Sequence, residues 1–436
     1  MKAAYVDVDP RIREILAEQG IAALYPPQEK ALPAVLGRRN LVLCIPTASG
    51  KSLVAYLAIL EGFLHGKPGG KALYIVPLRA LASEKHEELQ SFKRLGLKVG
   101  LATGDLDEKD DRLARFDVIV ATSEKMDSLL RHRVGWLQDI RVIVADEVHL
   151  IHDATRGPTL EVLLARFRAL NPEAQIVALS ATIRNSKELA DWLDAELVES
   201  DWRPTPLKKG VLFGRAITFE DRTKRTLTVE SNDAVTDLVM DMLAEKAQCL
   251  VFVNTRRSAE AAAKKLAKPV ARTLSADETQ KLEVLAKDAS DEGEPSLSGR
   301  HLGELVRHGV AFHTAGLSAA QRRLVEAQFR AGLIKVICAT PTLAAGVNTP
   351  ARRVVIRDVW RFDVNLGNQP LPVFEIQQMM GRAGRPRYDP YGEAVLIAKT
   401  DEERETLVAS YLDAEPEPLT SKLGSEPALR VHALAS

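Results

Sequence analysis

The sequence has little cysteine, few aromatic residues and no excess of charge of either sign. Its three cysteines, Cys44, Cys249 and Cys338, lie far apart in the 436 residues, each in an apolar, strand-like run. This pattern indicates buried thiols in a reducing compartment and argues against disulfides or a cysteine metal site. Lysine plus arginine and aspartate plus glutamate both number 59, so the net charge is zero. Any nucleic-acid binding must therefore depend on local basic patches.

Long hydrophobic runs are also missing. No apolar run approaches the ~18 residues that a membrane-spanning helix needs, and the first residues lack the basic-then-apolar pattern of a secretory signal. The hydrophobic content of 46% is that of an ordinary globular protein. The chain is long enough for two or three domains. We therefore expect a cytoplasmic or nucleoplasmic protein.

Short apolar runs alternate with helical patterns, and this layout occurs twice. The first series of runs comprises residues 40–43, 72–76, 98–101, 118–121, 142–145 and 176–179, and the second comprises 211–213, 250–253, 310–312, 336–339, 353–356 and 394–397. Each run is almost continuously hydrophobic, as buried parallel strands are. Two prolines in residues 200–207 predict a linker. The sequence therefore predicts two α/β domains, each with a doubly wound sheet.

An acidic segment, residues 276–300, interrupts the second series. It has few large apolar residues after Leu285. This composition predicts a solvated helix and loop that leave the second domain.

Residues 44–52, Cys-Ile-Pro-Thr-Ala-Ser-Gly-Lys-Ser, stand between a predicted strand and a predicted helix. Strand, tight loop, Gly-Lys-Ser and helix are the arrangement of a phosphate-binding loop. Backbone N–H groups at the helix start favour an anion. Lys51 can reach the β- and γ-phosphates, and the Ser52 hydroxyl can ligate Mg²⁺. The full pattern has glycine where this chain has Ile45, and the alternative is a strand–turn–helix junction that contains Gly-Lys-Ser by chance.

Polar residues follow two other predicted strands. Asp146 and Glu147 come directly after residues 142–145, and a carboxylate at that end of a central strand lies beside the phosphate loop in such folds. Asp146 can hold Mg²⁺, and Glu147 can orient and deprotonate the attacking water. An ordinary strand-end turn is the alternative. Ser180-Ala181-Thr182 follow residues 176–179, and their hydroxyls could relay between the phosphate site and another surface.

A basic segment near the end of the chain, residues 377–386, contains Arg382 and Arg385. Their spacing of three predicts that both lie on one helical face. Guanidinium groups supplied by a second domain can stabilise charge that develops on a γ-phosphate. The alternative is a basic helix that pairs with surface acids.

Together these segments resemble the superfamily 2 helicases. Ten motifs follow the order of that family along the whole chain: Gln28, 46–52, 77–81, 103–105, 121–125, 146–149, 180–182, 251–256, 340–347 and 378–385. The sequences of these motifs are most similar to those of the Ski-two-like branch, and within it to those of the archaeal and HelQ-type DNA helicases. The segments on which this similarity rests are Tyr-Pro-Pro-Gln at 25–28, residues 45–51, Asp-Glu-Val-His-Leu-Ile at 146–151 and residues 381–386. This branch tolerates a residue such as Ile45.

The resemblance implies two tandem RecA-like domains with parallel sheets, residues 1–199 and 200–407, and ATP and Mg²⁺ as cofactors. Residues 408–436 resemble the start of the family's winged-helix domain. The rest of the winged helix, the ratchet domain and the final helix-loop-helix are missing from the sequence. We therefore expect either a truncated chain or a short natural variant.

The resemblance also implies roles for individual residues. The residues implied to bind ATP are Tyr25 and Gln28, which would recognise adenine, and Thr47, Ala48, Ser49, Gly50, Lys51, Ser52, Gly346 and Asn348. The implied metal ligands are Ser52 and Asp146. Those implied in hydrolysis are Lys51, Asp146, Glu147, Gln378, Arg382 and Arg385. Those implied in coupling ATP state to domain contact are His149, Ser180 and Thr182. Those implied at the nucleic-acid strand are Arg79, Thr103, Ser123, Lys125, Thr255, Arg256, His313, Thr340 and Thr342.

Residues 359–370 contain two β-rich arms around an Asn/Gly turn, which predicts a hairpin. In similar helicases a hairpin at this place splits the duplex, and the likeness assigns that role to Trp360, Arg361 and Phe362. A simple surface hairpin is the alternative.

We therefore expect the motor core of an ATP-dependent 3′-to-5′ DNA helicase in replication-fork repair or recombination, with the polarity taken from the resemblance alone. The expected partners are single-stranded and forked DNA and repair or replication proteins. We expect a cytoplasmic monomer, associated with the nucleoid in a prokaryote. One alternative is an RNA helicase of the same branch, since contacts to the backbone barely distinguish the sugars. A second alternative is a non-catalytic clamp, but the intact catalytic residues argue against it. A P-loop kinase or GTPase does not fit, because such a protein needs one α/β domain and this sequence predicts two.

Overall fold

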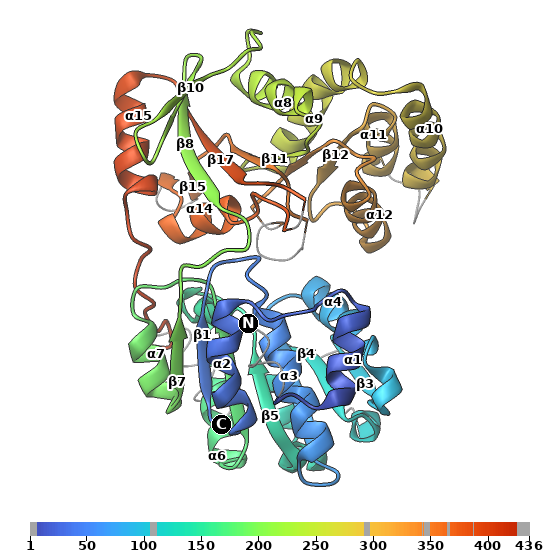
Figure 1. Ribbon diagram of the computed structural model, residues 1–436, viewed down its shortest axis with the longest axis vertical. Helices are drawn as coiled ribbons and strands as arrows, with labels where there is room; N and C mark the ends of the chain where they lie inside the picture. The colour runs from blue at the N-terminus through green and yellow to red at the C-terminus, as the bar shows by residue number, and fades with distance from the viewer. Residues whose placement is uncertain are drawn as a thin grey trace. The chain divides into compact units, whose positions relative to one another are not determined.

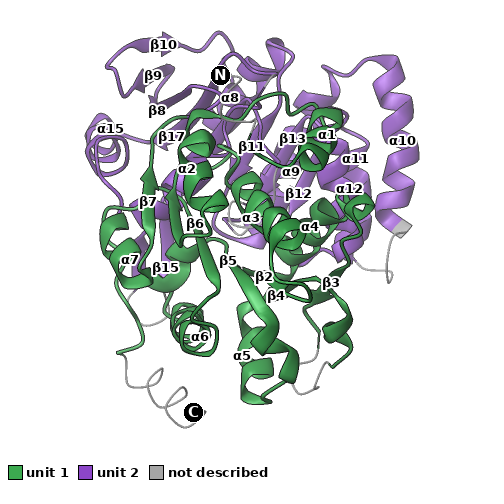
Figure 2. Ribbon diagram, turned by 60° about the horizontal axis from the view of Figure 1, so that its bottom comes forward, with its two compact units in different colours: residues 1–202, 417–436 green, residues 203–416 purple. Residues whose placement is uncertain are grey.

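The computed structural model describes residues 7–104, 111–291, 297–341, 343, 349–363, 367–386 and 388–424, which form two compact units (Figures 1 and 2). Unit 1 comprises residues 1–202 and 417–436, and unit 2 comprises residues 203–416. The chain therefore passes from one unit to the other twice. Within the described ranges, no helix is both long and apolar enough to cross a membrane.

Unit 1 is built on a parallel sheet with the strand order β3-β4-β2-β5-β6-β1-β7. The strands are β1 (Leu41–Cys44), β2 (Lys71–Val76), β3 (Val99–Ala102), β4 (Val118–Thr122), β5 (Ile140–Ala145), β6 (Gln175–Ser180) and β7 (Glu196–Glu199). The helices are α1 (Pro10–Glu18), α2 (Pro26–Leu36), α3 (Lys51–His65), α4 (Arg79–Gln90), α5 (Ser123–Arg131), α6 (Gly157–Leu170) and α7 (Ser186–Leu193), with 3₁₀ turns η1 (Lys93–Leu95), η2 (Asp111–Arg115), η3 (Gly135–Asp139) and η4 (Val148–His152).

One face of this sheet packs against α1 to α4. Alternate residues of the strands, such as Leu43, Tyr74 and Val144, belong to the same buried cluster as the apolar residues of these helices. Successive side chains of a strand point to opposite faces, so the other residues of each strand face away from α1 to α4. Both faces are buried, which is why the strands are nearly continuous apolar runs in the sequence.

Unit 2 contains a mixed sheet with the strand order β10-β9-β8-β17-β14-β11-β13-β12. The strands from β8 to β12 in this order are parallel, and β9 and β10 are antiparallel. The strands are β8 (Leu207–Phe213), β9 (Ala216–Phe219), β10 (Lys224–Thr226), β11 (Cys249–Phe252), β12 (Val310–His313), β13 (Val336–Ala339), β14 (Arg353–Ile356) and β17 (Gly392–Ala398). The helices are α8 (Ala234–Ala244), α9 (Arg256–Ala271), α10 (Ala276–Asp291), α11 (Leu297–Val306), α12 (Ala319–Arg330), α14 (Val373–Met380), α15 (Asp401–Leu407) and the π-helical turn η5 (Val408–Leu412).

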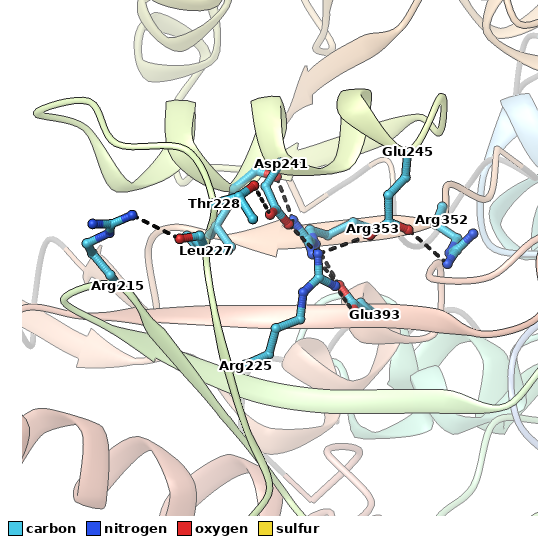
Figure 3. A network of polar contacts seen from close by, with 10 residues as sticks. Arg215, Arg225, Leu227, Thr228, Asp241, Glu245, Arg352, Arg353 and Glu393 are labelled. Atoms are coloured by element: carbon cyan, nitrogen blue, oxygen red, sulfur yellow. Dashed lines mark hydrogen bonds and ion pairs between the residues drawn. The ribbon is translucent and has the colours of Figure 1, made fainter.

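A buried ion network holds the strands of unit 2 to α8 (Figure 3). The wholly buried Arg353 of β14 donates to Glu393 of β17, and its Nη1 lies 2.9 Å from Asp241 Oδ2 of α8. Arg225 of β10 donates to the same two carboxylates, at 2.8 Å to Glu393 and 2.5 Å to Asp241. Each buried charge is thus paired, as a charge in a protein interior must be.

The predicted fold is confirmed: both units are RecA-like α/β domains, and every apolar run predicted as a strand forms one. The strands β7, β9 and β10 were not predicted. β7 and β10 are half-exposed or exposed along their length, so they lack the apolar signal of a buried strand. The three cysteines are free and buried, as predicted.

Within residues 276–300 the predicted helix forms as α10, but the prediction that it is solvated was wrong. Helix α10 buries Leu282, Leu285, Ala286 and Ala289 in the core of unit 2. These four residues recur at helical spacing and so share one face. The acidic residues on the other faces conceal this pattern in the composition of the segment.

The unit boundary after Trp202 lies inside the predicted linker, residues 200–207. Residues 408–416 belong to unit 2, whereas residues 417–424 pack on unit 1. There the Leu419 N–H donates to Asn185 Oδ1 at 2.7 Å, and the Leu419 carbonyl accepts from Asn185 Nδ2 at 2.9 Å. The interpretation of residues 408–436 as the start of a winged helix stays a prediction.

Candidate nucleotide and nucleic-acid sites

The predicted phosphate loop connects β1 to α3. Ile45 prolongs the strand: it is wholly buried, and its N–H donates to the Ser180 carbonyl at 3.3 Å. This explains why the chain has an apolar residue at this position of the motif. Ala48 and Gly50 have positive φ, 64° and 77°, so the loop turns tightly just before α3 begins at Lys51. The unpaired N–H groups and the dipole of a helix N-terminus favour an anion at such a place.

Gln28 supports this loop from α2. Its Oε1 accepts from the Tyr25 N–H at 2.8 Å, and its Nε2 donates to the Gly50 carbonyl at 2.9 Å. A Cβ atom at Gly50 would lie 2.4 Å from Gln28 Nε2, so this contact requires glycine. The two residues predicted to recognise adenine are therefore connected to the residue that precedes α3.

Trp202 contacts both Tyr25 and the phosphate loop, which the sequence did not predict. Its ring centroid lies 4.8 Å from that of Tyr25, and its carbonyl accepts from Ser49 Oγ at 3.0 Å. Trp202 lies within the predicted linker, whose prolines conceal its role. No local signal in the sequence marks these contacts, because Tyr25 and Ser49 are more than 150 positions away from Trp202.

Asp146 follows β5 and is held by two neutral donors. Its Oδ2 accepts from the Tyr74 hydroxyl at 2.9 Å, and its Oδ1 accepts from the Glu147 N–H at 2.9 Å. Burial, and then the nearby Glu147 charge, raise the pKa of Asp146, while Lys85 and Lys51 act in the opposite direction. Burial and the Glu147 charge therefore favour a cation beside Asp146, which would relieve the cost of the buried carboxylate.

The oxygen donors of unit 1 fit magnesium bound with a nucleotide. Among the described residues, no group of three or more His, Cys, Asp or Glu side chains could hold a metal by itself. Mg²⁺ prefers oxygen ligands and takes only one or two carboxylates together with substrate phosphates, and Asp146 and the Ser52 hydroxyl are such donors. Lys51 Nζ lies over the loop, 3.1 Å from the Ile45 carbonyl.

His149 joins the Asp146–His149 motif to residues 180–182. Its Nδ1 accepts from the Ala181 N–H at 3.4 Å, and its Nε2 lies 3.3 Å from Glu147 Oε2. Burial, and then the Lys51 charge, lower the pKa of His149 to about 3, so the ring is neutral and Nε2 donates to Glu147. This link passes through the backbone of Ala181, and a relay through the hydroxyls of Ser180 and Thr182 stays a prediction. Ser180 is buried and Thr182 is half-buried.

In unit 2, the prediction that Arg382 and Arg385 share a helical face was wrong. Helix α14, which carries the half-buried Gln378, ends at Met380 with Gly381 as its C-cap. Gly384 has φ 90°, a conformation that ends a helix. The two arginines therefore lie on a turn. This turn is bridged to Ala351, whose N–H donates to the Arg382 carbonyl at 3.0 Å.

The Arg385 guanidinium is held within unit 2. Its Nε and Nη2 each lie 3.0 Å from an Asp389 oxygen, and its Nη1 donates to Gln248 Oε1 at 2.6 Å. Arg203, which was not predicted, donates to the Gly381 and Ala383 carbonyls, each at 3.1 Å. Burial, and then the charge of half-buried Arg382, lower the Arg203 pKa to about 10.

The residues predicted to contact nucleic acid differ in their exposure. Arg79, Thr255 and Arg256 are exposed at the starts of α4 and α9, and helix N-termini and arginines are common phosphate contacts. Thr103 is half-buried. The buried group comprises Ser123, Lys125, His313 and Thr340; for these four, a direct contact stays a prediction. The predicted residues Thr342, Gly346 and Asn348 lie outside the described residues.

The predicted hairpin is confirmed. Strands β15 (Trp360–Asp363) and β16 (Gly367–Pro370) pair antiparallel. The side chains of Trp360 and Phe362 are 50% and 72% exposed. Arg361 Nη2 donates to Glu375 Oε1 of α14 at 2.6 Å, which ties one arm to the rest of unit 2.

Two RecA-like units, a predicted phosphate loop, an Asp-Glu pair after β5 and an arginine-bearing turn are the features that predicted a helicase from the sequence. Residues 25–189 match the DEAD/DEAH box helicase family, and residues 230–387 match the helicase conserved C-terminal domain. The chain thus contains a DEAD/DEAH box helicase domain and a helicase conserved C-terminal domain.

Within this class the chain is similar to archaeal proteins of one name. It is 53% identical to the ATP-dependent DNA helicase Hel308 of Methanocella arvoryzae and 47% identical to that of Pyrococcus horikoshii, in both cases over 100% of this chain and 59% of the relative. It is 46% identical to Hel308 of Pyrobaculum calidifontis, over 61% of that protein. The chain thus spans about three fifths of the length of the curated relatives it matches.

Proposed function

We propose that this chain is the motor core of an ATP-dependent DNA helicase that moves 3′-to-5′ along single-stranded DNA and separates duplex DNA. The observation that carries the proposal is the set of buried Asp146, half-buried Glu147 and buried His149, which is hydrogen-bonded internally and interacts with Lys51 of the predicted phosphate loop. The match of the whole chain to relatives named as DNA helicases favours DNA over RNA.

In the proposed mechanism, the loop and the N-terminus of α3 bind the phosphates of ATP, with Lys51 on the β- and γ-phosphates. Asp146 and Ser52 would hold Mg²⁺, which would neutralise phosphate charge. Glu147 accepts a proton from the attacking water, while the neutral His149 donates to Glu147 and fixes its orientation. Gln378, Arg382 and Arg385 of unit 2 would stabilise the charge that develops on the γ-phosphate.

The proposed track for the strand uses the exposed helix starts of both units. Arg79 in unit 1 and Thr255 and Arg256 in unit 2 would hold phosphates without reading bases. Closure driven by the γ-phosphate, followed by opening after hydrolysis, would move the strand. The hairpin that carries Trp360 and Phe362 would part the duplex.

The biological setting is part of the same proposal. We propose that the protein acts on single-stranded and forked DNA during fork repair or recombination, as a monomer, with repair or replication proteins as partners. We also propose the domain limits 1–199, 200–407 and 408–436, and association with the nucleoid.

The test is ATP hydrolysis by the chain alone, with single-stranded DNA and with RNA of equal sequence. Strong stimulation by DNA alone is the expected result, and equal stimulation by RNA would favour the RNA alternative. Stimulation by neither, with basal turnover present, would contradict a coupled motor. Polarity is tested by unwinding of duplexes with 3′ or 5′ tails, of which only the 3′-tailed one should be separated.

A further inference from the structure

A wholly buried tyrosine of unit 1 contacts the proposed magnesium ligand. Tyr74 lies on β2, which pairs with β5, and its side chain faces α3 and α4. Its hydroxyl donates to Asp146 Oδ2 at 2.9 Å, and its exposed fraction is 0%. A buried tyrosine hydroxyl needs a partner, and here the partner is a carboxylate that the proposed mechanism requires. Nothing in the motifs of the sequence singles out Tyr74.

A second tyrosine and an ion pair support Tyr74 from the helices. The Tyr56 ring of α3 lies 6.0 Å from the Tyr74 ring, and the Tyr56 hydroxyl donates to Glu88 Oε2 of α4. The same Glu88 oxygen lies 3.0 Å from Lys85 Nζ. Lys85 is only 6% exposed, and a lysine is almost never this buried unless it is paired. The contacts therefore extend from Asp146 to the middle of α4.

Helix α4 connects these contacts to the proposed nucleic-acid track. It begins at Arg79, which is exposed, and it runs without interruption to Gln90. Lys85 and Glu88 lie on the same helix as Arg79, so a displacement of its first turn moves them as well. A rigid helix with two discrete positions can carry coupling between two sites.

We propose that Tyr74, supported by Tyr56, Glu88 and Lys85, is a positioning residue through which α4 orients the Asp146 carboxylate for magnesium, so that DNA bound at the start of α4 strengthens metal binding. This inference rests on the proposed function. The Glu147 N–H holds one oxygen of Asp146 and Tyr74 holds the other, which leaves little rotation of the carboxylate. Mg²⁺ demands near-ideal geometry, and residues that orient a ligand affect metal affinity by about 10- to 100-fold.

The test measures binding of Mn²⁺ in the presence of ADP by electron paramagnetic resonance, with and without a single-stranded oligonucleotide. Oxygen ligands that suit Mg²⁺ also suit Mn²⁺. We expect Tyr74→Phe to weaken Mn²⁺ binding about tenfold, while affinity for ADP without metal stays unchanged. The matched control is Tyr411→Phe, which removes another buried hydroxyl, one that donates to the Leu371 carbonyl in unit 2 at 2.8 Å. Unchanged Mn²⁺ affinity in Tyr74→Phe would overturn the inference.

A second variant tests the connection to DNA. In the unsubstituted chain, we expect the oligonucleotide to raise Mn²⁺ affinity, and in Lys85→Met we expect that rise to be lost while Mn²⁺ affinity without DNA changes less than in Tyr74→Phe. No effect of DNA on Mn²⁺ binding in the unsubstituted chain would overturn the coupling. These readouts are separate from DNA-stimulated ATP hydrolysis, whose absence would count against the proposed function itself.

Discussion

The two RecA-like units have similar strand patterns, but they use buried charge differently. In unit 2, Arg353, Glu393 and Asp241 pair with one another inside the fold (Figure 3). In unit 1, the buried Asp146 is held by the neutral donors Tyr74 and Glu147 N–H, and its pKa is raised. A buried charge without an ionic partner is costly. At these two sites, the buried charges of unit 2 pair with one another, whereas the Asp146 carboxylate of unit 1 remains available to a cation.

The largest expected effect is on the chemistry of unit 1. Lys51→Ala removes the ammonium that is proposed to hold the β- and γ-phosphates, so ATP turnover should fall below detection while the fold remains. Turnover is measured as phosphate release and the fold by circular dichroism. Normal turnover would refute the role assigned to Lys51.

The next effect concerns the buried ion network of unit 2 and its contribution to stability. Arg353→Met leaves Glu393 and Asp241 with one less partner in the interior, and breaking a buried pair in this way costs about 3–5 kcal/mol. The free energy of unfolding, measured with urea, should fall by that amount. The matched control is Arg215→Met at the exposed pair with Glu230, where the loss should be about 0–1 kcal/mol. Equal losses in the two variants would remove the contrast between the buried network and the surface.

Arg385 tests whether unit 2 also takes part in the chemistry. If its guanidinium stabilises the γ-phosphate in the transition state, Arg385→Ala should reduce kcat by about 100-fold or more and leave nucleotide affinity unchanged. If Arg385 only ties Asp389 to Gln248, the variant would lose stability and keep its turnover. Comparison with Asp389→Asn, which weakens the tie but keeps the guanidinium, separates these two results.

The smallest effect is a pH dependence in unit 1. The pKa of His149 is lowered from 6.5 to about 3, so below pH ~6.5 the unfolded chain binds a proton that the folded chain rejects. This residue therefore costs no stability at pH 8 and an increasing amount as the pH falls towards 3. At pH 5 the cost is about 2 kcal/mol, at 1.36 kcal/mol per pKa unit.

The variant His149→Gln isolates this contribution. Between pH 8 and pH 5, its free energy of unfolding should fall by about 2 kcal/mol less than that of the unsubstituted chain, as measured by urea unfolding without metal. The same fall in both proteins would mean that His149 accepts a proton in the folded state.

The strands and the phosphate loop could be predicted because their signals are local. A buried strand needs an apolar run, and a phosphate loop needs glycine, lysine and serine next to one another. Tyr74, Trp202 and Arg203 could not be predicted, since their contacts exist only once distant segments have folded together. The error at Arg382 and Arg385 has a local cause: their spacing of three fits a helix, but Gly381 and Gly384 end it. The burial of helix α10 was not predicted, because its many acidic residues concealed the helical spacing of its apolar residues.

Residues 417–424 have a consequence for synthesis. They bind to unit 1 through Asn185, His152 and Glu161, which precede their partners by 234 to 268 positions. A ribosome must therefore complete all of unit 2 before unit 1 acquires these contacts. Nascent domains generally fold as units from the N-terminus, so unit 1 would spend the translation of more than 200 residues without Leu419, which lines a pocket together with Ile151, Leu189 and Trp192.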